Sequence, residues 1–181
     1  MSAAVNTTGA SSVGATGRAE RRRLVSAGVF AILAVAIATA AAWPIYETGR
    51  LVLVAAVAGI VGIGIAVAVT TMRAGSRIAI IALPVAFAVL VVPLAVPSAM
   101  TSPLAWLVGI RDGFAGLVLG WKQLLTLPTP VGDYQAVLVP IFAIALLGGF
   151  GVAVLAARQG RSATLAVPVA LAMSVFGPLF G

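Results

Sequence analysis

Two residue types are missing from this chain, and each absence excludes a kind of chemistry. The 181 residues include no cysteine and no histidine. Without cysteine there is neither a disulfide nor a thiolate metal site. Without histidine the chain lacks the commonest general base and any nucleophile–histidine pair. The sequence therefore predicts a protein that is not an enzyme and that holds no cofactor or metal.

Charge is also scarce. Only 8% of the residues are charged and 62% are hydrophobic, whereas about 25% of a soluble protein is charged. So few charges do not coat a surface that faces water, so the lipid bilayer must surround most of this chain. We predict an all-α, polytopic membrane protein.

Five apolar runs are long enough to cross a bilayer, which takes about 20 residues in a helix. Before them, residues 1–23 are predicted to form a disordered, basic cytoplasmic tail, and residues 24–181 a helical membrane domain. Trp43 and Tyr46 follow the first run and suit the headgroup region of the membrane. A cleavable signal peptide is an alternative interpretation, because a basic stretch, an apolar run and then Ala40–Ala42 resemble one. The predicted spans are residues 24–42, 51–72, 78–96, 136–157 and 162–180.

The net charge of +7 raises the question of nucleic acid binding. The basic residues form no stripe interleaved with aromatics, so we expect no nucleic acid partner. With Met1 in the cytoplasm and five crossings, eight basic residues lie inside and Arg50, Arg111 and Lys122 lie outside, which follows the positive-inside rule. We predict a multi-pass protein of the plasma membrane with a cytoplasmic N-terminus. The inside residues that carry this topology signal, beside Arg18, are Arg21, Arg22, Arg23, Arg73, Arg77, Arg158 and Arg161.

The segment between the third and fourth spans, residues 97–135, interrupts the apolar pattern. If its central part crossed as a sixth helix, Arg111 and Asp112 would enter the hydrocarbon core at about 2.5–3.5 kcal/mol each. Arg158 and Arg161 would also move outside. We therefore predict that the segment lies on the outer face or dips into it. The interfacial, re-entrant and spanning alternatives stay open.

Four glycines in this segment are spaced four, three and four residues apart. On a helix this spacing places Gly109, Gly113, Gly116 and Gly120 on one stripe. Such a stripe lets another helix backbone approach closely. Arg111 and Lys122 fall on the opposite face. We predict an interfacial helix with a glycine packing stripe; the alternative is that the glycines only loosen a loop.

Four short motifs in the second half of the chain occur in an order that is similar to one family. They are GWKQLLT from Gly120, PVGDY from Pro130, VLVP from Val137 and FGPLFG from Phe176. The order resembles the N-terminal membrane domain of bacterial transglutaminase-like membrane proteins. In that family, N-terminal spans carry a papain-like transglutaminase domain on the outer side.

The resemblance implies an anchor and not a catalyst, because the family's Cys–His–acid triad has no counterpart here. No catalytic residue carries over. Trp121 and Tyr134 are expected first as interface anchors and second as partner contacts. The positions that match the family as an outer-face motif are Trp121, Lys122, Thr126, Pro130, Gly132 and Tyr134.

The first functional hypothesis is a non-catalytic membrane domain that acts by helix packing and by anchoring a partner or domain. A membrane protein, an outer-face protein and a second copy of this chain all stay open as partners. The alternative is a small transporter or channel subunit for a hydrophobic or lipid-like cargo, although transporters usually place ionisable residues inside their spans. An enzyme is the third, weakest hypothesis, because only Asp112 and Asp133 share one loop.

Overall fold

The computed structural model describes residues 8–72, 76–96, 100, 102–126, 135–158 and 161–180, and every element among them is helical. α5, η3 and α6 continue one another, and η3 is a π-helical turn within this rod. The elements are α1 (Thr8–Tyr46), α2 (Gly49–Thr71), α3 (Ser76–Ala95), α4 (Pro103–Thr126), η2 (Gln135–Leu138), α5 (Val139–Ala143), η3 (Ile144–Gly148), α6 (Gly149–Ala157), α7 (Arg161–Thr164) and α8 (Ala166–Phe180).

Six helices within the described ranges are long and apolar enough to cross a membrane. Five of them coincide with the predicted spans, and the sixth is α4, the least apolar of the set. Large hydrophobic side chains such as Ile37, Ile60, Ile81 and Leu171 are exposed, as expected for a surface that faces lipid. The all-α, polytopic fold is therefore confirmed.

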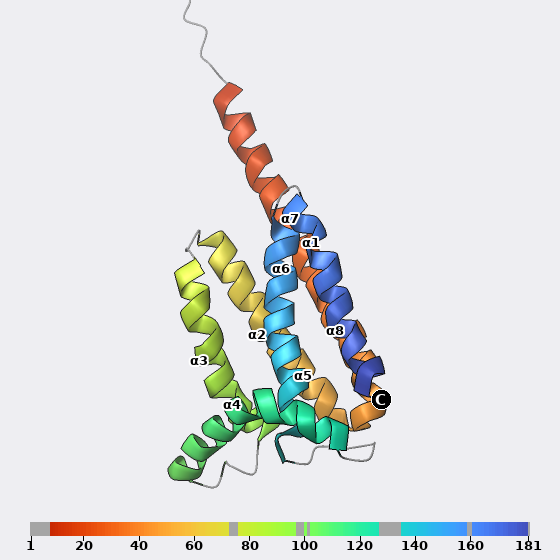
Figure 1. The fold of residues 1–181 in the computed structure, drawn as a ribbon. Coiled ribbons are helices and arrows are strands. Elements are labelled where there is room, and N and C mark those ends of the chain that lie inside the picture. The colour runs from red at the N-terminus through yellow and green to blue at the C-terminus, as the bar shows by residue number, and fades with distance from the viewer. Residues whose placement is uncertain are drawn as a thin grey trace, which may run out of the picture.

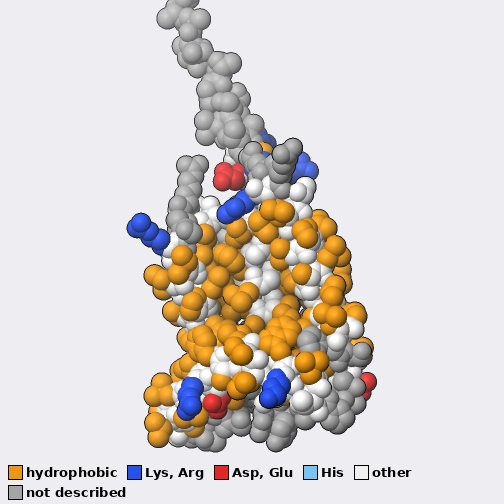
Figure 2. All heavy atoms as spheres, viewed as in Figure 1, with side chains coloured by type: hydrophobic (Ala, Val, Ile, Leu, Met, Phe, Trp, Pro, Cys, Tyr) orange, Lys and Arg blue, Asp and Glu red, His pale blue; other side chains and the backbone are white. Residues whose placement is uncertain are grey.

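The five other long helical segments run along a common direction, while α4 lies across one end of the bundle (Figure 1). At the opposite end the first turns of α1 extend well beyond the other helices. Charged side chains gather toward the two ends of the visible face, and hydrophobic side chains fill the band between them (Figure 2). Because α4 lies crosswise, its length alone does not make it a membrane crossing.

The N-terminal segment differs from its prediction as a disordered tail. α1 begins at Thr8, so residues 8–23 continue the first span as a helix. Ala19 and Arg21–Arg23 are good helix formers. Extending an existing helix costs much less than nucleating a new one, so these residues prolong the helix. Residues 1–7 lie outside the described part of the chain.

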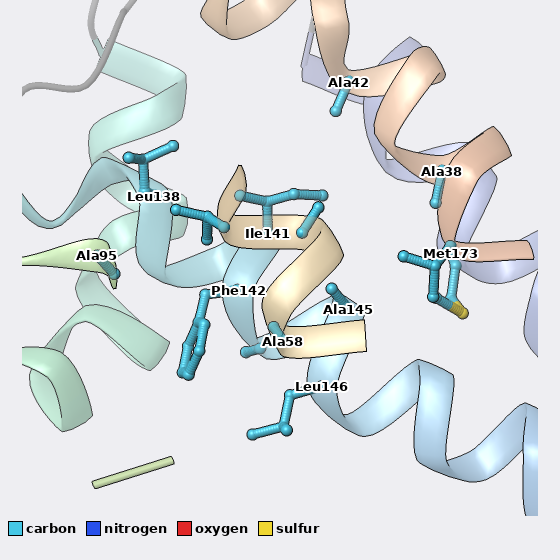
Figure 3. Close-up of a cluster of buried hydrophobic side chains, with 14 of the residues drawn as sticks. Ala38, Ala42, Ala58, Ala95, Leu138, Ile141, Phe142, Ala145, Leu146 and Met173 are labelled. Carbon is cyan, nitrogen blue, oxygen red and sulfur yellow. The ribbon is translucent and has the colours of Figure 1, made fainter. Parts of the chain in front are cut away.

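The core is built on the α5–η3–α6 rod, which packs against α1, α2, α3 and α8. Phe142 and Leu146 of the rod are fully buried, and Ala58 of α2 lies beside them (Figure 3). Glycine allows two backbone contacts here. A Cβ atom on Gly62 would collide with the Leu146 carbonyl, and one on Gly177 would collide with the Ala41 carbonyl.

The turn between α1 and α2 corrects the prediction for Tyr46. Its side chain is buried, and its hydroxyl donates to the Val137 carbonyl oxygen over 3.1 Å. The phenol finds its polar partner inside the protein, so the ring packs in the core and does not face the headgroups. Trp43 is 44% exposed. Glu47 makes the turn with a φ of 46°, and Thr48 caps α2 by accepting from the Arg50 amide.

Candidate functional site

The first candidate site is α4, whose glycine stripe faces the bundle. Gly109, Gly113, Gly116 and Gly120 are all buried. A Cβ atom on Gly113 would lie 2.5 Å from a methyl group of Val91 on α3. One on Gly116 would lie 3.1 Å from Val139 on α5. The stripe therefore packs against this chain's own helices and is covered by them.

The opposite face of α4 is exposed. Arg111 and Lys122 lie on this face and Asp112 lies at its edge, beside the glycine stripe; all three are exposed, and Val118 on the same face is 75% exposed. Residues at the interface of a membrane commonly combine apolar and charged side chains in this way. We call this exposed face, defined by these four residues, the α4 platform.

The outer-face motif divides between the core and the surface. Trp121 is half-buried, its indole N–H donates to the Leu117 carbonyl over 2.7 Å, and its ring meets Phe176 edge-on at 5.4 Å. Lys122 and Thr126 are exposed. Trp121 thus joins α4 to α8. Pro130, Gly132 and Tyr134 lie outside the described residues.

Arg50, near the start of α2, binds the carbonyl end of α3. The sequence shows only that its charge balances that of Glu47 and does not indicate this contact. The Arg50 guanidinium donates to the Leu94 and Pro93 carbonyls, over 3.3 and 3.4 Å. α3 ends at Ala95, so the Pro93 and Leu94 carbonyls belong to its last turn, which has no following turn of helix to supply donors. Arg50 supplies donors to these two carbonyls and places a positive charge at the negative end of the helix.

Except for Arg73, the predicted topology residues belong to segments at the end of the bundle away from α4 (Figure 1). Arg21, Arg22, Arg77 and Arg158 are exposed and Arg23 is half-buried. Arg73 and the side chain of Arg161 lie outside what the structure describes. We call this the basic end of the bundle.

The second candidate site is an apolar groove of about 590 Å³ between α1 and α2. Ala36 and Ala40 of α1, and Ala56 and Gly59 of α2, form its sides. Thr39 is the hydroxyl-bearing residue of the lining. The sequence does not reveal this groove, because it depends on how two apolar helices are placed relative to each other. We call it the α1–α2 groove.

Among the described residues there is no cluster of three His, Cys, Asp or Glu side chains that could hold a metal ion. No family model, curated protein or solved structure matches the chain. The likeness to transglutaminase-like membrane proteins therefore stays a prediction from the motifs.

Proposed function

We propose that this chain is a non-catalytic membrane domain that anchors an outer-face protein domain through the α4 platform. The observation that carries the proposal is the placement of α4. The helix lies across the end of the bundle (Figure 1), is fixed there by its buried glycines, and leaves Arg111, Asp112 and Lys122 exposed. A rigid helix that presents charged groups beside a membrane suits the positioning of a partner.

The end of α8 supports the same proposal. The C-terminal end of the chain lies at the end of the bundle where α4 crosses (Figure 1). Trp121 of α4 packs on Phe176 of α8, so the two helices are in contact. A domain that follows residue 181 would emerge beside the α4 platform. This is the arrangement that the resemblance to transglutaminase-like proteins implies.

The proposed orientation places the α4 platform outside a bacterial plasma membrane and the basic end in the cytoplasm. Its support is the charge distribution, since Arg21, Arg22, Arg77 and Arg158 belong to the end away from α4. Basic residues near membrane segments favour the cytoplasmic side.

The test begins with the coding sequence directly after residue 181. The proposal expects an outer domain with cysteine and histidine, either in frame or in the adjacent gene. That domain is then expressed separately with this chain, and its retention on membranes is measured. Replacing Arg111 and Lys122 by glutamine should lower retention, whereas Arg77→Gln, an exposed arginine at the basic end, should leave it unchanged.

Two results contradict the anchor proposal. One is the absence of any such domain in frame or adjacent. The other is equal retention by the wild-type chain and the Arg111→Gln/Lys122→Gln variant.

Transport of a hydrophobic cargo is the second candidate, and the α1–α2 groove is the observation that favours it. A transporter must expose its cargo site to both sides of the membrane. The groove covers only one part of α1 and α2, from Trp43 and Val52 to Ile32 and Ile63. The groove therefore supports binding of a hydrophobic ligand better than its passage.

A further inference from the structure

We propose that the α1–α2 groove binds one acyl chain of a membrane lipid, in the leaflet that lies at the turn between α1 and α2. The proposal is independent of the anchor function, because the groove and the α4 platform share no residue. It assigns a ligand class, a single hydrocarbon chain, to the cavity of about 590 Å³.

The chemistry of the lining selects hydrocarbon. Thr39 is the one residue of the lining with a side-chain hydroxyl, and that hydroxyl donates to the Val35 carbonyl over 2.7 Å. Trp43 adds an indole N–H at one end, and none of the lining residues in the described part of the chain is charged. Away from Trp43, a ligand that needed hydrogen bonds or a counter-ion would lose its hydration there without compensation. An acyl chain forms no hydrogen bonds with water, so it loses none when it enters the groove.

The length of the groove along the helices matches the thickness of one leaflet. On α1 the lining runs from Trp43 to Ile32, and eleven residues at 1.5 Å each span about 16 Å. This is about half of the 30 Å hydrocarbon core of a bilayer. A lipid chain occupies one leaflet, whereas a partner transmembrane helix occupies both. The length of the groove therefore favours the lipid.

Small residues create the hollow. Ala36, Ala40 and Ala56 are exposed to the groove where larger side chains would fill it. Gly59 lets α2 approach α1, since a Cβ atom there would lie 2.9 Å from a methyl group of Val35. The resulting volume falls within the range of about 300–1,000 Å³ that is typical of ligand sites.

Trp43 lies at one end of the groove and is 44% exposed, so its fluorescence can report on a ligand bound there. The full chain in detergent is titrated with phosphatidylcholine that carries bromine near the ester end of one acyl chain. Subtracting the signal of a Trp43→Phe variant isolates Trp43 from Trp106 and Trp121. We expect quenching of Trp43 that saturates, with one bound lipid per chain by native mass spectrometry.

Filling the groove should remove the binding. We expect Ala36→Leu/Ala56→Leu to weaken the lipid affinity about tenfold or more, a change of about 1.4 kcal/mol per factor of ten. Ala172→Leu is the matched control, because Ala172 is exposed on α8 outside the groove. It should bind as the wild type does. If the double variant fails to fold, as judged by circular dichroism, Ala40→Leu alone provides the same test.

Three results overturn the proposal. The first is quenching that rises linearly with lipid and is equal in wild type and groove-filling variant, as expected of lipid in contact with any apolar surface. The second is equal weakening by Ala172→Leu. The third is tighter binding of an anionic phosphatidylglycerol with the same acyl chains, because it would show recognition of the headgroup and not of the chain.

Discussion

Two glycines in α2, two residues apart, allow the close packing of this bundle to be measured. A Cβ atom on Gly62 would collide with the Leu146 carbonyl and would lie 3.2 Å from the Phe150 nitrogen. A Cβ atom on Gly64 would meet no atom from another part of the described chain within 4 Å. Replacing either glycine by alanine raises helix propensity by about 1 kcal/mol. Only Gly62→Ala also overpacks the core, at about 1–3 kcal/mol or more.

The gain in propensity cancels when the two variants are compared. The difference between their free energies of unfolding is then the cost of the contact between α2 and η3, and we expect about 1–3 kcal/mol. Gly64→Ala should be more stable than wild type by up to about 1 kcal/mol. Unfolding in mixed micelles, followed by circular dichroism, measures both. Equal stability of the two variants would refute the close approach of these helices.

Three further substitutions test individual contacts. Tyr46→Phe leaves the buried Val137 carbonyl without its donor and should lower the free energy of unfolding by about 1 kcal/mol; no change would contradict the bond. Arg50→Met removes the donors at the end of α3 and should lower the free energy of unfolding by about 1–2 kcal/mol, with faster amide exchange at that end. The control Lys122→Met, at an exposed position, should stay within about 0.5 kcal/mol of wild type. Gln123→Leu should raise the free energy of unfolding by about 1 kcal/mol, because a buried polar group without a hydrogen bond is costly. The Gln123 Oε1 atom is such a group among the described residues. A lower free energy of unfolding would show that the amide has a partner.

The spans could be predicted because their signal is strong and local. The second span was placed at residues 51–72, and α2 covers Gly49–Thr71. Length and apolarity alone define such a segment. The sequence of the transverse α4 also shows a pattern, since Arg111 and Lys122 mark one face and the four glycines the other. All four glycines are buried.

Burial inside the spans could not be predicted, because lipid-facing and core-facing positions are both apolar. On α1 the small residues Ala34 and Ala38 are buried, while the larger Ile32 and Ile37 face outward. Hydrophobic patterning cannot separate these classes in a membrane. The α1–α2 groove and the inward position of Tyr46 both depend on this choice of faces, so neither was visible in the sequence. The roles of the topology residues and of the outer-face motif stay predictions.

The most direct test of the account is the side of the membrane on which α4 and the end of α6 lie. The chain has no cysteine, so Lys122→Cys and Arg158→Cys each carry a single thiol at an exposed position. Intact cells are treated with a membrane-impermeant maleimide before and after permeabilisation. The account predicts that Lys122→Cys reacts in intact cells and Arg158→Cys only after permeabilisation. Labelling of Arg158→Cys in intact cells would contradict it, because α4 would then cross the membrane as a sixth helix or the whole chain would be inverted.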